Sequence, residues 1–168
     1  MALSQRERTR PRPVNPLDLI ERVVQANDWP FDRTSEREIA AEVAGKWCDY
    51  RLFFAWRDDV HALHFTCAFD VRVPPERHRD VYGLLALMNE KLWLGHFDLW
   101  SEENLPMFRH SIPLRGTAGL SAEQLEDLVD IAIGECERFY PAFQYVVWAG
   151  KTPGEALTAS ILQTVGEA

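Results

Sequence analysis

The sequence has little cysteine and no long apolar run. Its three cysteines, Cys48, Cys67 and Cys136, lie far apart along the chain, and none belongs to a CxxC pair. An odd number of separated cysteines indicates neither a disulfide framework nor a zinc knuckle, so we expect reduced thiols that pack as small apolar side chains. Because no stretch of about 18 apolar residues and no N-terminal signal segment is present, we expect a cytoplasmic protein with no membrane partner.

Basic residues are also in the minority, with 18 lysines and arginines against 26 aspartates and glutamates. Nucleic-acid binding needs clustered basic side chains that displace counterions from phosphates, so no nucleic-acid partner is expected. The N-terminus is the exception, because Arg6, Arg8, Arg10 and Arg12 alternate with other residues there. This composition cannot bury apolar surface, so residues 1–14 are predicted to form a disordered tail. A nucleic-acid or membrane arm is the less favoured interpretation of the same arginines.

Catalytic signatures are missing too: the chain has no GxSxG, no HExxH and no GxGxxG after a strand. Gly150, Lys151 and Thr152 match the end of a phosphate-binding loop, but Tyr145 stands where that motif requires glycine. Thr152 is better explained as a helix cap, because Glu155 completes a capping box with it. We therefore predict no catalytic, cofactor-binding or metal-binding residue and do not expect an enzyme.

The chain does contain enough apolar residues for the core of one domain. It has 168 residues, of which 46% are hydrophobic, and this is enough for a single core over residues 15–168. The predicted fold is α+β, an antiparallel β-sheet with helices packed on one face, in the order α-β-β-β-α-β-β-α plus a C-terminal helix. Apolar residues at three- and four-residue steps predict these helices, over residues 16–27, 75–92, 121–140 and 153–165. Pro141 is expected to kink or interrupt the third.

Residues 47–70 read as a β-hairpin with its tip at Asp58 and Asp59. A tip at these two residues would pair Trp56 with His61 and Phe54 with Leu63, and would make one face of the hairpin almost entirely apolar. His61 and His64 then point to opposite sides of the strand, so they are not expected to bind a metal together.

A second hairpin is predicted in GHFDLWSEENLPMFRHSIPL, residues 95–114, with its turn at Glu103 and Asn104. In this register Asp98 lies opposite Arg109, His110 joins the buried face beside Phe97, and His96 points outward. The same segment supplies the alternative interpretation, a small enzyme or ligand-binding domain. Its acid/base pair would come from His96, Asp98, Glu102 and His110.

Surplus aromatic residues suggest a partner surface. Trp47 and Phe53 on the outward side of the first hairpin, with Trp100 and Met107 on the second, could form an exposed apolar patch. Tyr82 and Trp93 widen the apolar surface of the helix over residues 75–92 beyond one stripe, which is compatible with a dimer contact. For Tyr82 and Trp93 the alternative is a helix that is deeply buried in its own core. For the four hairpin residues the alternative is that the C-terminal helices cover them. The candidate partner or dimer surface comprises Trp47, Phe53, Tyr82, Trp93, Trp100 and Met107.

Three segments together resemble the YbjN family of small bacterial proteins: LLALMNEKLWLGHFDLW, ENLPMFRHSIPL and LSAEQLEDLVDIAIGECERFYPAF. In that family a helix ending in an Asn-containing motif leads to a Gly-led hairpin and then to a long helix with Tyr-Pro near its end. The matching positions are Asn89, Gly95, Phe97, Tyr140 and Pro141, and the resemblance covers residues 16–143.

The resemblance implies a fold similar to type III secretion chaperones and a role described as regulation of sensory transduction, without an agreed catalytic residue set. Secretion chaperones form dimers and hold an extended segment of another protein. We therefore expect a non-enzymatic protein-binding module, chaperone-like or regulatory, that acts as a homodimer on a protein partner. A shared fold alone does not establish that function.

Overall fold

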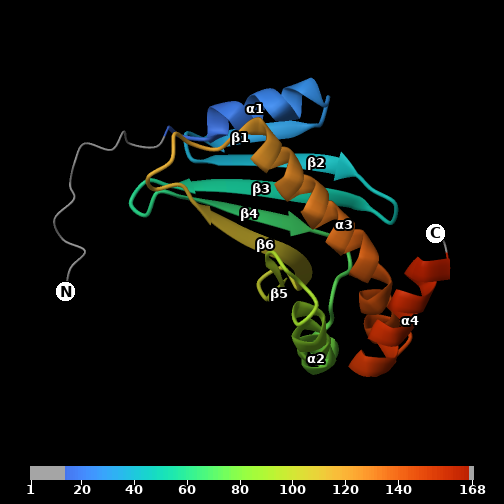
Figure 1. Cartoon of the computed structure of the whole chain (residues 1–168). Helices are drawn as coiled ribbons and strands as arrows, with labels where there is room; N and C mark the ends of the chain where they lie inside the picture. Colours follow the sequence, from blue (N-terminus) through green and yellow to red (C-terminus); the bar gives the residue numbers. More distant parts are fainter. Residues whose placement is uncertain (1–13, 167–168) are drawn as a thin grey trace, which may run out of the picture.

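The computed structural model describes residues 14–166 and shows a six-stranded antiparallel sheet with helices (Figure 1). The helices are α1 (Leu17–Ala26), α2 (His78–Asn89), α3 (Ala122–Val147) and α4 (Pro153–Gly166), and the short 3-10 helix η1 (Pro75–Arg77) precedes α2. The strands are β1 (Phe31–Ser35), β2 (Glu38–Ala44), β3 (Asp49–Arg57), β4 (Ala62–Ala68), β5 (His96–Trp100) and β6 (Leu105–Pro113). Residues 1–13 lie outside this range, so the predicted disordered tail stays a prediction.

The strands lie side by side in the order β1-β2-β3-β4-β6-β5. Burial alternates along β2 and β3; in β3, for example, Tyr50, Leu52, Phe54 and Trp56 are buried and their neighbours are not. Helices α1 and α3 lie across the face of the sheet that carries these side chains, and α4 packs against α2 and α3 (Figure 1). The predicted α+β class, with an antiparallel sheet and helices on one face, is confirmed. The structure has one strand more before α2, the edge strand β1.

Both hairpins differ from the predicted register by two residues. Trp56 pairs with Leu63 and Phe54 with Phe65, because residues 58–61 form the turn and His61 adopts a left-handed backbone with φ of 50°. In the second hairpin residues 101–104 form the turn, and Phe97 pairs with Phe108. Since side chains alternate with a period of two, a shift of two residues leaves the side chains of the paired strands on their predicted faces. Trp47, which precedes β3, is an exception, because it lies on the helical side rather than outward.

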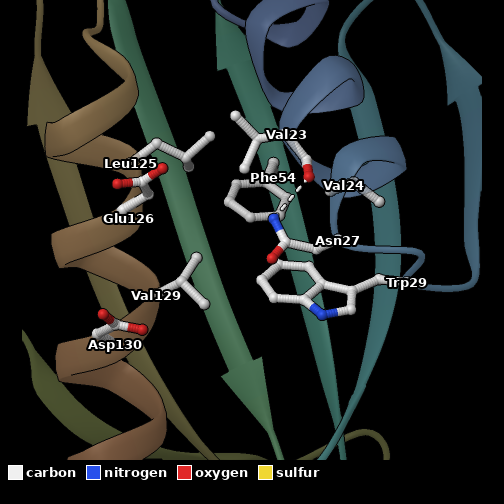
Figure 2. A pocket seen from close by; sticks show the side chains of 9 residues that line it. All are labelled: Val23, Val24, Asn27, Trp29, Phe54, Leu125, Glu126, Val129 and Asp130. Carbon is white, nitrogen blue, oxygen red and sulfur yellow. Dashed lines mark hydrogen bonds between the residues drawn. The ribbon is translucent and has the colours of Figure 1, made fainter.

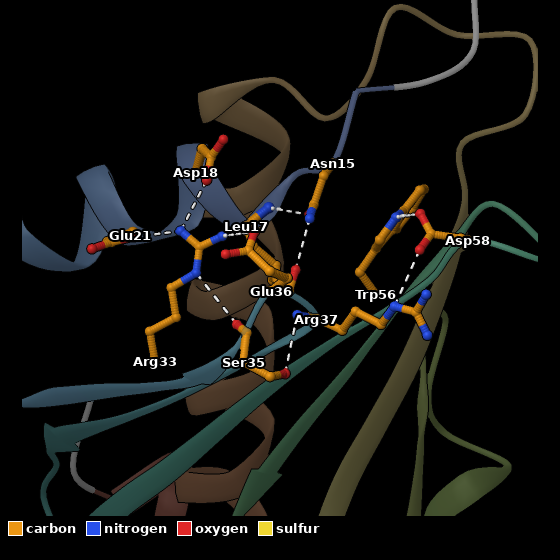
Figure 3. Close-up of polar contacts among 10 residues, drawn as sticks. All are labelled: Asn15, Leu17, Asp18, Glu21, Arg33, Ser35, Glu36, Arg37, Trp56 and Asp58. Atoms are coloured by element: carbon orange, nitrogen blue, oxygen red, sulfur yellow. Dashed lines mark hydrogen bonds and ion pairs between the residues drawn. The ribbon is translucent and has the colours of Figure 1, made fainter.

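Helix α1 is fixed to the sheet by polar contacts around the β1–β2 turn (Figure 3). The side chain of Asn15 accepts a hydrogen bond from the Leu17 N–H at 3.0 Å and donates to the Glu36 carbonyl at 2.8 Å. Asn15 therefore caps the helix as predicted. Arg33 of β1 reaches the carboxylates of Asp18 and Glu21 on α1, at 2.9 and 2.6 Å, and these ion pairs join the helix to the edge strand.

Helix α2 ends at Asn89, and the side chain of this residue determines where β5 begins. Its Nδ2 donates to the Phe97 carbonyl at 3.1 Å, and its Oδ1 accepts from the Phe97 N–H at 2.7 Å. Gly95, between the two, has φ of +67° and packs against the ring of Phe108. The loop from α2 to β5 is thus held by Asn89, Gly95 and Phe97, the positions that carry the family resemblance.

Helix α3 begins with the predicted capping box of Ser121 and Gln124 and continues without interruption past Pro141 to Val147. Of the two expectations for Pro141, the interruption is therefore wrong, and the kink stays a prediction. A proline has no N–H for the carbonyl four residues earlier, which is that of Glu137. Here the indole N–H of Trp47 donates to this carbonyl at 3.1 Å, and the helix continues because a side chain replaces the missing backbone donor.

Candidate functional site

A groove lies between the second half of α1 and the first half of α3, with the sheet beneath it (Figure 2). Phe54 of β3 forms its floor, Val23 and Val24 line it on the α1 side, and Leu125 and Val129 line it on the α3 side. These five side chains are apolar, whereas Asn27, Glu126 and Asp130 add polar groups to the lining, so the groove offers apolar and polar surface side by side.

Residues directly after α1 close one end of the groove. The Trp29 N–H donates to the Val24 carbonyl at 3.2 Å, and the preceding residue, Asp28, turns the chain with φ of 55°. Asn27 folds its side chain back, and its Nδ2 donates to the Val23 carbonyl at 2.8 Å. The indole of Trp29 therefore lies across the end of the groove as a flat, half-buried surface (Figure 2).

The rim on the α3 side is acidic. Glu126 and Asp130 lie four residues apart, one helical turn, and both are exposed beside the groove (Figure 2). Neither carboxylate has an ion-pair partner within residues 14–166. Helix α3 as a whole has one basic residue, Arg138, against six acidic ones: Glu123, Glu126, Asp127, Asp130, Glu135 and Glu137. The groove thus combines an apolar interior with uncompensated negative charge at its edge.

The groove is small, with a volume of about 240 Å³. Pockets for drug-sized ligands usually measure roughly 300–1,000 Å³. A space of this size fits one long side chain better than a whole metabolite. It is therefore suited to a side chain that a second polypeptide segment inserts.

The six residues predicted as a partner surface lie in three separate places. Trp47 lies on the helical side, where it stacks on Tyr140 of α3 at a ring-centroid distance of 5.9 Å. Tyr82 of α2 and Trp93, which follows α2, are exposed by 52% and 100%. The other three, Phe53, Trp100 and Met107, alternate with the inner-face residues of their strands and point to the opposite face of the sheet. Met107 is buried there rather than exposed as predicted. The structure therefore does not bring the six together into one patch.

The residues of the alternative acid/base site also lie apart. Asp98 forms an ion pair with Arg109 at 2.8 Å on the outer face of the sheet, as predicted, although the two are diagonal rather than opposite. His110 lies on the inner face, opposite Phe65, and burial lowers its pKa. His96 is exposed on the outer face, and Glu102 is exposed in the turn. No two of the four form a hydrogen bond to each other within the described residues.

The outer face holds one polar pair that sequence reasoning missed. His64 and Ser111 lie directly opposite each other on β4 and β6, with Nδ1 and Oγ 2.8 Å apart. Thr66 Oγ1 is 3.3 Å from the other ring nitrogen of His64. Burial lowers the pKa of His64, and the positive charges of Arg109 and His96 lower it further. The pair lies on an open sheet face rather than in a cavity.

Two of the three cysteines meet in the core. The Sγ atoms of Cys67 on β4 and Cys136 on α3 are 3.7 Å apart, and both residues are fully buried. Burial raises the pKa of Cys136 well above its ordinary value. Cys48 is half-buried, and burial raises its pKa to about 12. All three are free thiols, as predicted, and neutral thiols of this kind pack as apolar side chains.

Across residues 14–166, none of the helices has the length and apolar character that crossing a membrane requires.

One of the comparisons with known proteins, that with solved structures, supports the fold described above. No curated protein matches the sequence. Among solved structures, the fold is similar to the crystal structure of YbjN, a putative transcription regulator from E. coli, with a TM-score of 0.53 and 13% identity. That match covers 92% of this chain and 97% of the other. At this level of identity the match concerns the fold alone, and the expected similarity to type III secretion chaperones stays a prediction.

The sequence itself matches a family profile over residues 16–145. The profile is that of YbjN, described as "Putative bacterial sensory transduction regulator". The match includes α1, the whole sheet and α3 as far as Tyr145, and therefore both walls and the floor of the groove. The chain belongs to the YbjN family.

Proposed function

We propose that this protein is a non-enzymatic regulatory module that binds an arginine-containing segment of a protein partner in the groove between α1 and α3. The observation that carries the proposal is the apolar groove edged by Glu126 and Asp130. Family membership supports a regulatory role, and the groove provides the chemistry for binding.

Arginine is the side chain that fits both properties of the groove. Its aliphatic stem packs on apolar surface while its charged end stays near water. The stem would lie over Phe54 and Val129, and the guanidinium would reach the carboxylates at the rim. A guanidinium also stacks on aromatic rings, and Trp29 offers such a ring at the end of the groove. Lysine would pair with the same carboxylates but lacks the planar group that stacks.

The separation of the predicted acid/base residues supports a non-enzymatic role. A general acid or base must lie within hydrogen-bond reach of the group it serves. Asp98 is paired with Arg109, and His110 and His96 lie on opposite faces of the sheet. The enzyme alternative would need a substrate that joins groups from both faces, and the groove lies beside neither histidine.

Self-association is the second part of the proposal. Trp93 is fully exposed, and Leu94 beside it is exposed by 48%. Large aromatic side chains that a monomer leaves uncovered often lie at the centre of protein interfaces. We therefore propose a homodimer whose contact includes Trp93 and Leu94 in the turn after α2. These residues do not line the groove.

The binding proposal can be tested with a fluorescein-labelled peptide in which arginine alternates with alanine, ARARARA. Fluorescence polarisation should show binding to the full chain that weakens about tenfold in E126Q/D130N, because two charge-assisted contacts are lost. The double variant E90Q/E102Q removes the same charge from exposed sites away from the groove and should bind normally. The lysine peptide AKAKAKA should bind more weakly than ARARARA. Equal binding to E126Q/D130N and E90Q/E102Q would refute the site.

A further inference from the structure

We propose that the N-terminal arginine segment of this chain, residues 1–13, docks in the groove between α1 and α3 and competes with the partner for it. This inference rests on the proposed function, because it names the groove as an arginine-binding site and adds a regulator carried by the chain itself. The occupant is a segment of the same chain. Three features support this choice: the position of Val14, the charges on α1 and α3, and the spacing of the arginines.

Position comes first. The Val14 carbonyl oxygen lies 3.8 Å from where a Cβ on Gly119 would be, two residues before Ser121 caps α3. Asn15 is held by its contacts to Leu17 and Glu36 (Figure 3). The chain that precedes Val14 therefore joins the fold at the end of the molecule where α3 begins, next to the groove.

Charge then selects which helix the arginines meet. Among the acidic residues of α1, Asp18 and Glu21 are already paired with Arg33 (Figure 3). The carboxylates of Glu126 and Asp130 on α3 have no such partner in the described part of the chain. The positive segment is thus attracted to the α3 side of the groove, which is its uncompensated side.

Spacing matches as well. In an extended chain, alternate residues lie on the same side about 6.6 Å apart, so Arg6, Arg8, Arg10 and Arg12 would form one row if the segment docks in extended form. On a helix, residues four apart lie on one face about 6 Å apart along the axis. Glu126 and Asp130 have this relation, and so do Glu123 and Asp127. Pro11 and Pro13 favour extended backbone at the two arginines that precede them.

The segment is also long enough. From Ser121 to Asp130, α3 rises about 14 Å. Six extended residues span about 20 Å, so Arg8, which lies six residues before Val14, could reach the far end of the groove. Arg10 and Arg12 would then meet the earlier carboxylates of α3.

Such docking would act as built-in competition. A tethered segment is present at an effective concentration in the millimolar range, whatever the protein concentration. A free arginine peptide must displace it, so the apparent affinity of the groove for a partner falls. A partner with more arginines, or a change that neutralises the segment, would release the groove.

The test uses the full chain and three variants. R6S/R8S/R10S/R12S removes the charge of the segment, R6K/R8K/R10K/R12K keeps the charge without the planar group, and E126Q/D130N changes the groove. Methyl NMR spectra of Val23, Leu125 and Val129 report on the groove without any added peptide. Val71, which is buried outside the groove, serves as the internal control.

The expected result is that groove methyl signals differ between the wild type and the serine variant at low salt. The difference should shrink in about 1 M salt, which screens charges beyond a few ångströms. Signals of the lysine variant should lie between the two. In the E126Q/D130N background, substitution of the arginines should change these signals little, because the partner charges are already gone.

Titration with ARARARA separates this inference from the proposed function. The serine variant should bind the peptide about tenfold more tightly than the wild type. Identical groove spectra of the wild type and the serine variant would overturn the docking even if the peptide binds. Spectral differences that grow with protein concentration would also overturn it, because the segment of a second copy would then be the occupant. No peptide binding to the serine variant would refute the proposed function, whatever the spectra show.

Discussion

The indole N–H of Trp47 donates to the carbonyl oxygen of Glu137, the atom that Pro141 deprives of its helical donor. Trp47 also stacks almost parallel to Tyr140, with an angle of 4° between the rings. Tyr140 and Pro141 are the Tyr-Pro pair of the family resemblance. Trp47, which precedes β3, thus stabilises α3 at Pro141, where the proline would otherwise leave a helical carbonyl without a donor.

We predict that W47F destabilises the protein by about 1–3 kcal/mol, because the half-buried Glu137 carbonyl loses the indole donor. Urea unfolding measures this change. In the P141A background the backbone N–H of residue 141 can bond to Glu137, so the cost of W47F should be smaller there. A double-mutant cycle gives the coupling energy between Trp47 and Pro141. Additive effects of the two substitutions would show that the indole does not replace the missing donor.

Gly95 and Gly134 form a matched pair for a second prediction. A Cβ on Gly95 would clash with Phe108 Cζ and would lie 2.8 Å from the Arg109 carbonyl oxygen, at φ of +67°. Within residues 14–166, and apart from the surrounding backbone of α3 itself, no atom lies within 4 Å of a Cβ on Gly134, which is exposed in the middle of α3. We expect G95A to destabilise by more than about 2 kcal/mol and G134A to stabilise by about 0.5–1 kcal/mol. Thermal unfolding of the two variants should give shifts of opposite sign, and equal shifts would contradict this prediction.

The sequence was sufficient to predict which face of each of the five predicted strands is buried, because that property depends on alternation. Tyr50, Phe54 and Phe97 are all buried as their patterns indicate. The register was not predictable in the same way, since a register shift of two residues leaves the same side chains on the buried face and so produces the same pattern. Both hairpins have four-residue turns instead of the predicted two-residue turns, and the length of a turn depends on local contacts. In the first hairpin, for example, Trp56 Nε1 donates to Asp58 Oδ1 at 2.6 Å.

The groove was not predictable from any one segment. Phe54 looks like an ordinary core residue, Trp29 like part of a loop, and Glu126 and Asp130 like the solvated side of an amphipathic helix. Only the tertiary structure brings α1, β3 and α3 to one place. One feature of the sequence could have indicated the acidic rim of the groove: α3 has an excess of acidic over basic residues, whereas the N-terminus is rich in arginine.

A third prediction concerns acid. Burial lowers the pKa of both His64 and His110 below 6.5, so the folded protein binds protons at these sites less readily than the unfolded chain. The free energy of unfolding should therefore fall as the pH drops through about 6.5 towards the folded pKa values. Urea unfolding at about pH 7.5 and 5.5 should show a larger loss in the wild type than in H64Q/H110Q. The same loss in both proteins would assign the acid sensitivity to other groups.

The last prediction tests the proposed homodimer. If Trp93 lies at the centre of the contact, light scattering of the wild type at micromolar concentration should give about twice the chain mass of 19.4 kDa. Loss of a central interface tryptophan costs about 2 kcal/mol or more, so W93S should weaken the dimer about thirtyfold and shift the mass towards one chain. W148S is the matched control, because Trp148 is exposed by 63% at the end of α3 and lies outside the proposed contact. A wild-type mass of one chain would refute the dimer. Equal effects of W93S and W148S would place its contact elsewhere.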